Sequence, residues 1–300
     1  MTDKKKGFVL ETDEGNVDVD IDGIKQLAEE GNIDGLYALG MAYLFGWEIE
    51  QNTEKGYELL EKAANGEQFE AMTLLVRMFF SGDYDNMDSE KAVEYSKKAA
   101  AAGVSDAQLF LGIAYMDGVE VEQDYKKAAE LFRSSANQGN SEARNSLAYL
   151  YQQGLGVELD TSKAFKLYKN AASAGNVNAQ YQTGTCYEIG IGAEVNRIKA
   201  AEWYKKAAEQ GDAFSMDRLG ILYYNSSSDL PQDPKASFEW FMKAALEGLP
   251  ESMYCLACYY LDGFGIEKSE DEAKKWLNMA KEGGSARAGE LLDSLNNKTD

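Results

Sequence analysis

Histidine is absent from this chain of 300 residues, and proline and cysteine occur only three times each. The lack of histidine excludes every His-based catalytic triad and removes the commonest ligand of zinc. Three cysteines are too few for a disulfide framework and fit a reducing compartment. The sequence holds no apolar run near the ~18 residues of a membrane span and no signal-peptide centre. We therefore expect a cytoplasmic protein that does not contact a membrane.

Positive charge is also scarce, because 30 Lys and Arg stand against 51 Asp and Glu, for a net charge of −21. This excess of acids opposes binding to nucleic acid, which needs clustered Lys and Arg. The acids indicate either a solvated surface or a preference for basic partners, and we favour the first explanation. Ala, Leu, Lys and Glu dominate while Val and Ile are sparse, so the composition predicts an all-helical protein.

One phrase recurs along the chain, in forms such as LGIAYMDGVEVEQDYKKAAELFRSSANQG from Leu111 to Gly139. Its first leucine, here called the anchor, returns after 36 residues five times and after 37 residues once, with Thr183 in its place once. The anchors are Leu39, Leu75, Leu111, Leu147, Thr183, Leu219 and Leu256. A fixed period of this length predicts stacked two-helix units.

Each unit is predicted to hold two helices. In the third unit Ala107, Leu111 and Ala114 form the inward stripe of a first helix over 105–117, and a glycine such as Gly139 closes the unit in the left-handed conformation. The closing glycines are Gly66, Gly103, Gly139, Gly175, Gly211, Gly248 and Gly283. A capping residue precedes each second helix, at Asn52, Asp88, Asp124, Asp160, Asn196, Asp233 and Ser269. Glycine inside the first helix predicts a closely passing helix backbone, at Gly40, Gly112, Gly184 and Gly220.

The units together predict an all-α fold, a right-handed α-solenoid of helix-turn-helix repeats over residues 19–296. About seven units of 36–37 residues are flanked by half-repeats, a lone second helix over 20–31 and a lone first helix over 285–296. We expect residues 1–18 to be a disordered acidic tail and 297–300 to be a C-terminal tail.

These repeats resemble the Sel-1-like repeat family, a relative of the tetratricopeptide repeats. The family phrase joins LGxxYxxGxGV to KAxxWxxKAAxxG and stands here as TGTCYEIGIGAEVNRIKAAEWYKKAAEQG from Thr183 to Gly211. The second unit departs from it with LVRMFFSGDYDNMDSEKA, and the sixth has a longer loop, NSSSDLPQDPKA. The resemblance implies an adaptor that holds other proteins, and it does not name the partner.

No constellation of residues with catalytic spacing stands out, so we predict no enzyme, no cofactor and no metal site. Cys255 and Cys258 have the CxxC spacing, but only Cys186 remains to complete a zinc site, so we interpret the thiols as packing or groove-lining groups. The Gly-x-Gly pairs lack the lysine of a phosphate loop, and we interpret them as turn glycines. These pairs begin at Gly154, Gly190 and Gly263.

In tetratricopeptide-type solenoids the first helices line the concave face, so the resemblance places three positions of each unit in a groove. They stand two residues before the anchor, two after it and five after it. Their side chains vary from unit to unit and include tyrosines, which suit binding, although they could instead pack on the next unit. The predicted groove residues are Tyr37, Met41, Arg77, Phe80, Leu109, Met116, Asn145, Tyr149, Gln152, Tyr181, Glu188, Tyr224 and Tyr254. Asn145 and Gln152 are expected to bond the backbone of an extended peptide.

An acidic stripe begins successive first helices, at Asp34, Glu70, Asp106, Glu142 and Glu251. We favour interaction with the helix dipole over a carboxylate ladder for Lys/Arg-rich partners. The function predicted from these features is a monomeric, non-catalytic scaffold that binds a protein or peptide, with basic partners as one class. Two alternatives stay open: a hydrolase with a carboxylate or Ser/Lys site, and a solenoid that assembles with itself through its exposed ends.

Overall fold

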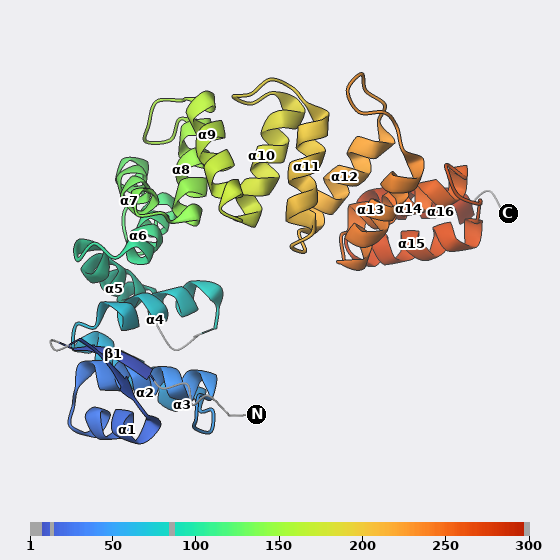
Figure 1. Ribbon diagram of the computed structural model, residues 1–300. Helices are drawn as coiled ribbons and strands as arrows, with labels where there is room; N and C mark the ends of the chain where they lie inside the picture. The colour runs from blue at the N-terminus through green and yellow to red at the C-terminus, as the bar shows by residue number, and fades with distance from the viewer. Residues whose placement is uncertain (1–7, 13–14, 84–87, 297–300) are drawn as a thin grey trace. The chain divides into compact units, whose positions relative to one another are not determined.

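The computed structural model describes residues 8–12, 15–83 and 88–296 (Figure 1). Two compact units are distinguished and are described separately here, residues 1–143 with 155–157 and residues 144–154 with 158–300. Apart from one hairpin of strands, all regular elements of the described residues are α-helices. The all-α solenoid class is confirmed, and the prediction of one repeat domain over 19–296 stays a prediction.

The helices alternate as the repeat predicts. The first helices are α2 (Ile33–Phe45), α4 (Phe69–Ser81), α6 (Ser105–Asp117), α8 (Ser141–Gln153), α10 (Val177–Ile189), α12 (Ala213–Tyr224) and α14 (Pro250–Asp262). The second helices are α3 (Thr53–Asn65), α5 (Ser89–Ala101), α7 (Tyr125–Asn137), α9 (Thr161–Ser173), α11 (Arg197–Ala208), α13 (Pro234–Leu246) and α15 (Glu270–Glu282). The predicted half-repeats are α1 (Ile21–Glu29) and α16 (Ala286–Asn296).

The apolar stripes and the caps are both confirmed. Ala107, Leu111 and Ala114 of α6 are buried and belong to one hydrophobic core cluster of the first unit. All seven predicted caps accept a hydrogen bond from a backbone N–H in the first turn of the second helix. Such a bond satisfies a donor that the helix itself cannot pair, so each second helix begins at the residue after its cap.

The glycine inside the first helix meets an aromatic ring rather than a helix backbone in three of the four repeats that contain it. A Cβ added at Gly112, Gly184 or Gly220 would lie 2.6–2.7 Å from the ring of Phe132, Tyr204 or Phe241, each on the second helix of the same repeat. In the first repeat, by contrast, Gly40 lies close to the backbone of α3, with the Gly56 carbonyl 3.1 Å from such a Cβ. The predicted close backbone is therefore present there, whereas the other glycines make room for a large ring.

The closing glycine is left-handed in five of the seven units, with φ from 89° to 102°. The prediction is wrong for Gly66 and Gly283, which have negative φ. The left-handed residue there is the next one, Glu67 at φ 68° or Gly284 at φ 97°. In both units the closing glycine stands one residue closer to its anchor than in most other units. The left-handed residue itself keeps the usual distance from the anchor.

The Gly-x-Gly pairs are turn glycines, as predicted, because Gly154, Gly190 and Gly263 and their partners all have φ between 66° and 81°. The second glycine also packs on the start of the preceding repeat's second helix. A Cβ at Gly192 would lie 2.0 Å from the Thr161 carbonyl oxygen. In the longer sixth loop Asp229 makes this contact instead, since its carboxylate accepts from the backbone N–H of Arg197 at 2.6 Å.

A hairpin of two antiparallel strands precedes α1, with β1 at Phe8–Thr12 and β2 at Gly15–Val19 paired from Phe8↔Val19 to Thr12↔Gly15. It differs from the disordered tail predicted over 1–18. The alternation of apolar and polar residues in FVLET and GNVDV favours strands, whereas the prediction followed the acidic composition. Residues 1–7, 13–14 and 297–300 of the predicted tails lie outside the described residues.

Candidate binding site

The predicted groove residues lie on the first helices at three levels of exposure. Leu109 is buried, with 2% of its surface exposed. Arg77, Tyr149 and Tyr224 are exposed, the two tyrosines by 44% and 46%. The half-buried positions are Tyr37, Met41, Phe80, Met116, Asn145, Gln152, Tyr181, Glu188 and Tyr254. Most of these side chains are thus partly packed and partly exposed to solvent. This agrees both with a lining of a groove and with packing on the next unit.

A cavity of about 500 Å³ in the first unit brings three of them together. Arg77 and Phe80 of α4 and Leu109 of α6 line it, beside the start of α8. Arg77 is paired with Asp106, whose carboxylate also accepts from the Asn140 side chain at 2.9 Å. The charge of Arg77 is therefore matched within the protein, Glu142 adds an exposed carboxylate to the lining, and Phe80 and Phe110 provide the aromatic wall.

Two predicted groove residues of the second unit are bonded to their own second helices. The Tyr168 hydroxyl donates to the Gln152 side-chain oxygen at 2.8 Å. In the next repeat the Tyr204 hydroxyl donates to Glu188 at 2.7 Å, and Arg218 forms an ion pair with the same carboxylate. Burial raises the pKa of Tyr204 and the Glu188 charge raises it further, so this hydroxyl stays protonated and donating. Gln152 and Glu188 therefore each accept a hydrogen bond from the second helix of their own repeat, and their contact with a peptide stays a prediction.

Asn145 is different from its neighbours, because its side-chain oxygen is buried and finds no hydrogen-bond partner within the described residues. An unpaired buried acceptor costs free energy. The expectation that Asn145 bonds the backbone of a peptide is compatible with this unpaired oxygen.

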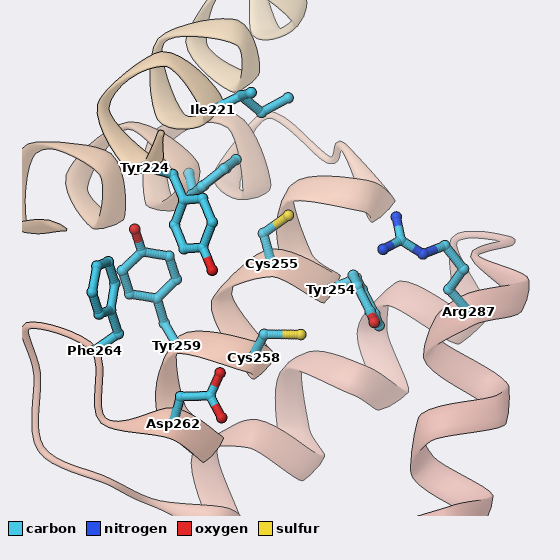
Figure 2. Close-up of a pocket in the computed structure, with 10 residues that line it drawn as sticks. Ile221, Tyr224, Tyr254, Cys255, Cys258, Tyr259, Asp262, Phe264 and Arg287 are labelled. Carbon is cyan, nitrogen blue, oxygen red and sulfur yellow. The ribbon is translucent and has the colours of Figure 1, made fainter. Parts of the chain in front are cut away.

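A second cavity, of about 320 Å³, lies wholly within the second unit (Figure 2). The predicted residues Tyr224 of α12 and Tyr254 of α14 line it, with a wall of apolar and aromatic side chains. The complete lining is Ile221, Tyr224, Phe241, Tyr254, Cys255, Cys258, Tyr259, Asp262, Phe264 and Arg287. Its position on the first helices of the last two repeats is the one predicted for a groove.

Cys255 and Cys258 both line this cavity, as one of the two interpretations of the CxxC spacing had it. They are free thiols, and Cys186 is a free, buried one. Burial raises the pKa of the Cys255 thiol to about 12 and that of the Cys186 thiol to about 11. Since the thiolate is the nucleophile, these cysteines are poorly suited to covalent catalysis at neutral pH.

Five charged or aromatic residues of the second cavity were not among the predicted ones, namely Phe241, Tyr259, Asp262, Phe264 and Arg287. Asp262 stands six residues after its anchor, Phe264 lies between the two turn glycines, and Arg287 belongs to α16 beyond the last full repeat. Asp262 and Phe264 could have been found by extending the repeat positions into the turn. Arg287 lies on the half-repeat α16, beyond the seven full units to which the groove positions were applied, and its guanidinium lies over the Tyr254 ring.

The acidic stripe lies in the first turns of the first helices, where the helix dipole favours it. Three of its members also bond the start of the next repeat. Asp34 accepts from Gln68 at 3.3 Å, Asp106 from Asn140, and Glu251 from Ser285 at 2.8 Å. These carboxylates therefore connect neighbouring repeats.

The described residues contain neither a membrane-spanning helix nor a metal-binding cluster of side chains. None of the described helices is both long and apolar enough to cross a membrane. Within the same residues no three Cys, Asp or Glu side chains gather closely enough to hold a metal ion.

Comparison with known proteins identifies one family, and the similar solved structures include two of about the same identity. The model described as Sel1 repeat matches residues 33–67, 70–104, 105–140, 141–176, 177–212, 213–249 and 250–285. The crystal structure of c5321, a protective antigen of uropathogenic Escherichia coli strains with an SLR fold, is 28% identical at a TM-score of 0.75. The match covers 93% of this chain and 60% of that one, so the chain spans well under two thirds of its length.

A Sel1 repeat protein from Oxalobacter formigenes is 29% identical at a TM-score of 0.72, over 92% of this chain and 79% of that chain. No curated protein matches this chain at a significant level.

Proposed function

Because the chain belongs to the Sel1 repeat family, whose members are typically non-catalytic helical scaffolds, we propose that it binds a protein or peptide segment on its first helices. The observation that carries this proposal is the position of the two cavities. Residues that the resemblance to tetratricopeptide-type solenoids placed in a groove line these cavities, namely Arg77, Phe80 and Leu109 in one unit and Tyr224 and Tyr254 in the other. We also propose that the protein acts as a cytoplasmic monomer without a cofactor.

The exposed tyrosines provide the binding energy in this proposal. Tyr149 and Tyr224 present 44% and 46% of their surface to solvent although they stand on helices with buried cores. A tyrosine buries a large area at low entropic cost when a partner covers it. The Ser252 hydroxyl donates to the Asp217 carboxylate at 2.6 Å, but Ser252 is fully buried, so this pair does not favour the hydrolase.

Affinity capture from native lysate tests the proposal with three baits. The first is the wild type and the second carries Tyr149→Ala with Tyr224→Ala. The third is a matched control with Leu246→Ala and Met279→Ala, which removes side chains of 73% and 47% exposure from the second helices α13 and α15. We expect one protein to be retained by the wild type and the control and lost by the double tyrosine variant. Equal retention by all three baits would place the interaction elsewhere.

A further inference from the structure

The cavity of the second unit is lined by two charged side chains, and only one of them has its charge matched within the protein. The Arg287 guanidinium pairs with Glu251 at 3.2 Å and lies over the Tyr254 ring, 4.3 Å from its centroid. The Asp262 carboxylate, which is exposed, forms no ion pair or hydrogen bond with the described residues. The unmatched charge of this cavity is therefore negative.

The place of Asp262 in its helix strengthens that negative charge. It is the last residue of α14, and Gly263 follows it in the left-handed conformation at φ 70°. The last carbonyl groups of a helix lack intrahelical donors and form the negative end of the helix dipole. A carboxylate is unfavourable at that end, so a cation bound there would be attracted by both the side chain and the helix.

Aromatic rings border the same space. Tyr224 lies 5.5 Å from Phe264 and 6.0 Å from Tyr259, measured between ring centroids. Figure 2 shows the Asp262 carboxylate and the Cys258 thiol on one face of α14, with Tyr224 and Phe264 on the neighbouring wall. The faces of such rings attract cations, and the half-exposed Tyr224 ring is available to one.

We propose that this cavity takes the guanidinium of an arginine side chain on the bound segment, held by the Asp262 carboxylate and the Tyr224 ring. The proposal rests on the scaffold function and names the chemistry of its partner. Arginine fits better than lysine because its planar group stacks on a ring and bonds a carboxylate through two N–H groups. The net charge of −21 assists the approach of a basic segment.

Small probes test the cavity apart from any partner. The wild type, with its tyrosine rings labelled for NMR, is titrated at low salt with N-acetyl-arginine amide and with N-acetyl-citrulline amide. The second probe has nearly the same shape and no charge. We expect the arginine probe to shift the Tyr224 signals and to bind at least about tenfold more tightly, as one charge-assisted contact allows.

Asp262→Asn should remove this preference. Asp117→Asn is the matched control, because Asp117 also ends a first helix before a left-handed glycine, Gly118, and does not line the cavity. We expect Asp117→Asn to bind as the wild type does. Equal binding of both probes to the wild type, or an unchanged preference in Asp262→Asn, would overturn the proposal. So would tighter binding of N-acetyl-glutamate amide, which would mark Arg287 as the ligand-binding group.

The two proposals fail separately. If the arginine probe does not bind while the double tyrosine variant still loses its partner, the scaffold stands and the arginine site is wrong. If the probe binds as expected while all baits capture alike, the cavity recognises arginine but the capture site lies elsewhere.

Discussion

Replacing Gly192 with alanine should weaken the fold far more than the same change at Gly211. Both glycines have left-handed backbones, with φ of 67° and 93°. An alanine Cβ at position 192 would lie 2.0 Å from the Thr161 carbonyl oxygen, whereas at position 211 it would find nothing within 4 Å. The pair therefore separates the cost of the backbone conformation from the cost of the contact.

The expected magnitudes follow from these two costs. A left-handed alanine costs about 1–2 kcal/mol, and part of this is offset because alanine restricts the unfolded chain. Gly211→Ala should then lower the free energy of unfolding by about 1 kcal/mol. At Gly192 the loop must also move away from α9, and overpacking of this kind costs a further ~1–3 kcal/mol. Side-chain rotation cannot relieve the contact, because the backbone fixes the position of the alanine Cβ and the Thr161 oxygen is itself a backbone atom.

Urea unfolding followed by circular dichroism measures the difference, with both variants compared at the same denaturant slope. Hydrogen exchange then locates it, and we expect lost protection at the start of α9 in Gly192→Ala alone. Equal losses of stability in the two variants would refute the reasoning, since they would show that the close approach of the loop to Thr161 carries no energy.

Three further predictions concern the second unit. Tyr204→Phe removes the donor to the Glu188 carboxylate and should lower the free energy of unfolding by ~1–3 kcal/mol. Tyr168→Phe removes a donor to the neutral Gln152 amide and should cost ~1 kcal/mol. The midpoints of urea unfolding compare the two variants. Burial raises the pKa of Asp217 above its unfolded value, so the ionised carboxylate destabilises the fold at a pH above the folded-state pKa. Asp217→Asn should therefore raise the melting temperature at pH 7, and this gain should disappear below the ordinary aspartate pKa. With its pKa raised to about 12, the Cys255 thiol should react with a disulfide reagent at pH 8 far more slowly in the folded protein than in urea.

The binding residues could be predicted from the sequence only in part. The family resemblance supplied the groove positions of a first helix, and Tyr224 and Tyr254 were found in this way at the second cavity, whereas Leu109 at such a position is buried. It does not tell which of them bond their own second helix, as Glu188 does through Tyr204. Arg287 was not predicted because it stands on the half-repeat α16, beyond the seven full units, and the contact of its guanidinium with the Tyr254 ring joins two different helices.

The sequence by itself determined the repeat, the helix ends and the family. These features depend on contacts between residues three or four apart, such as Asn196 capping the N–H of Lys199, and such contacts recur wherever the same letters recur. Tertiary structure alone decided that the Tyr204 ring covers Gly184, that Asp229 takes the place of a turn glycine at Arg197, and that Asp262 lines a cavity whose Arg287 pairs with Glu251 instead. Each of these contacts joins segments that are distant in the sequence, and the spacing of residues along one helix does not determine such contacts.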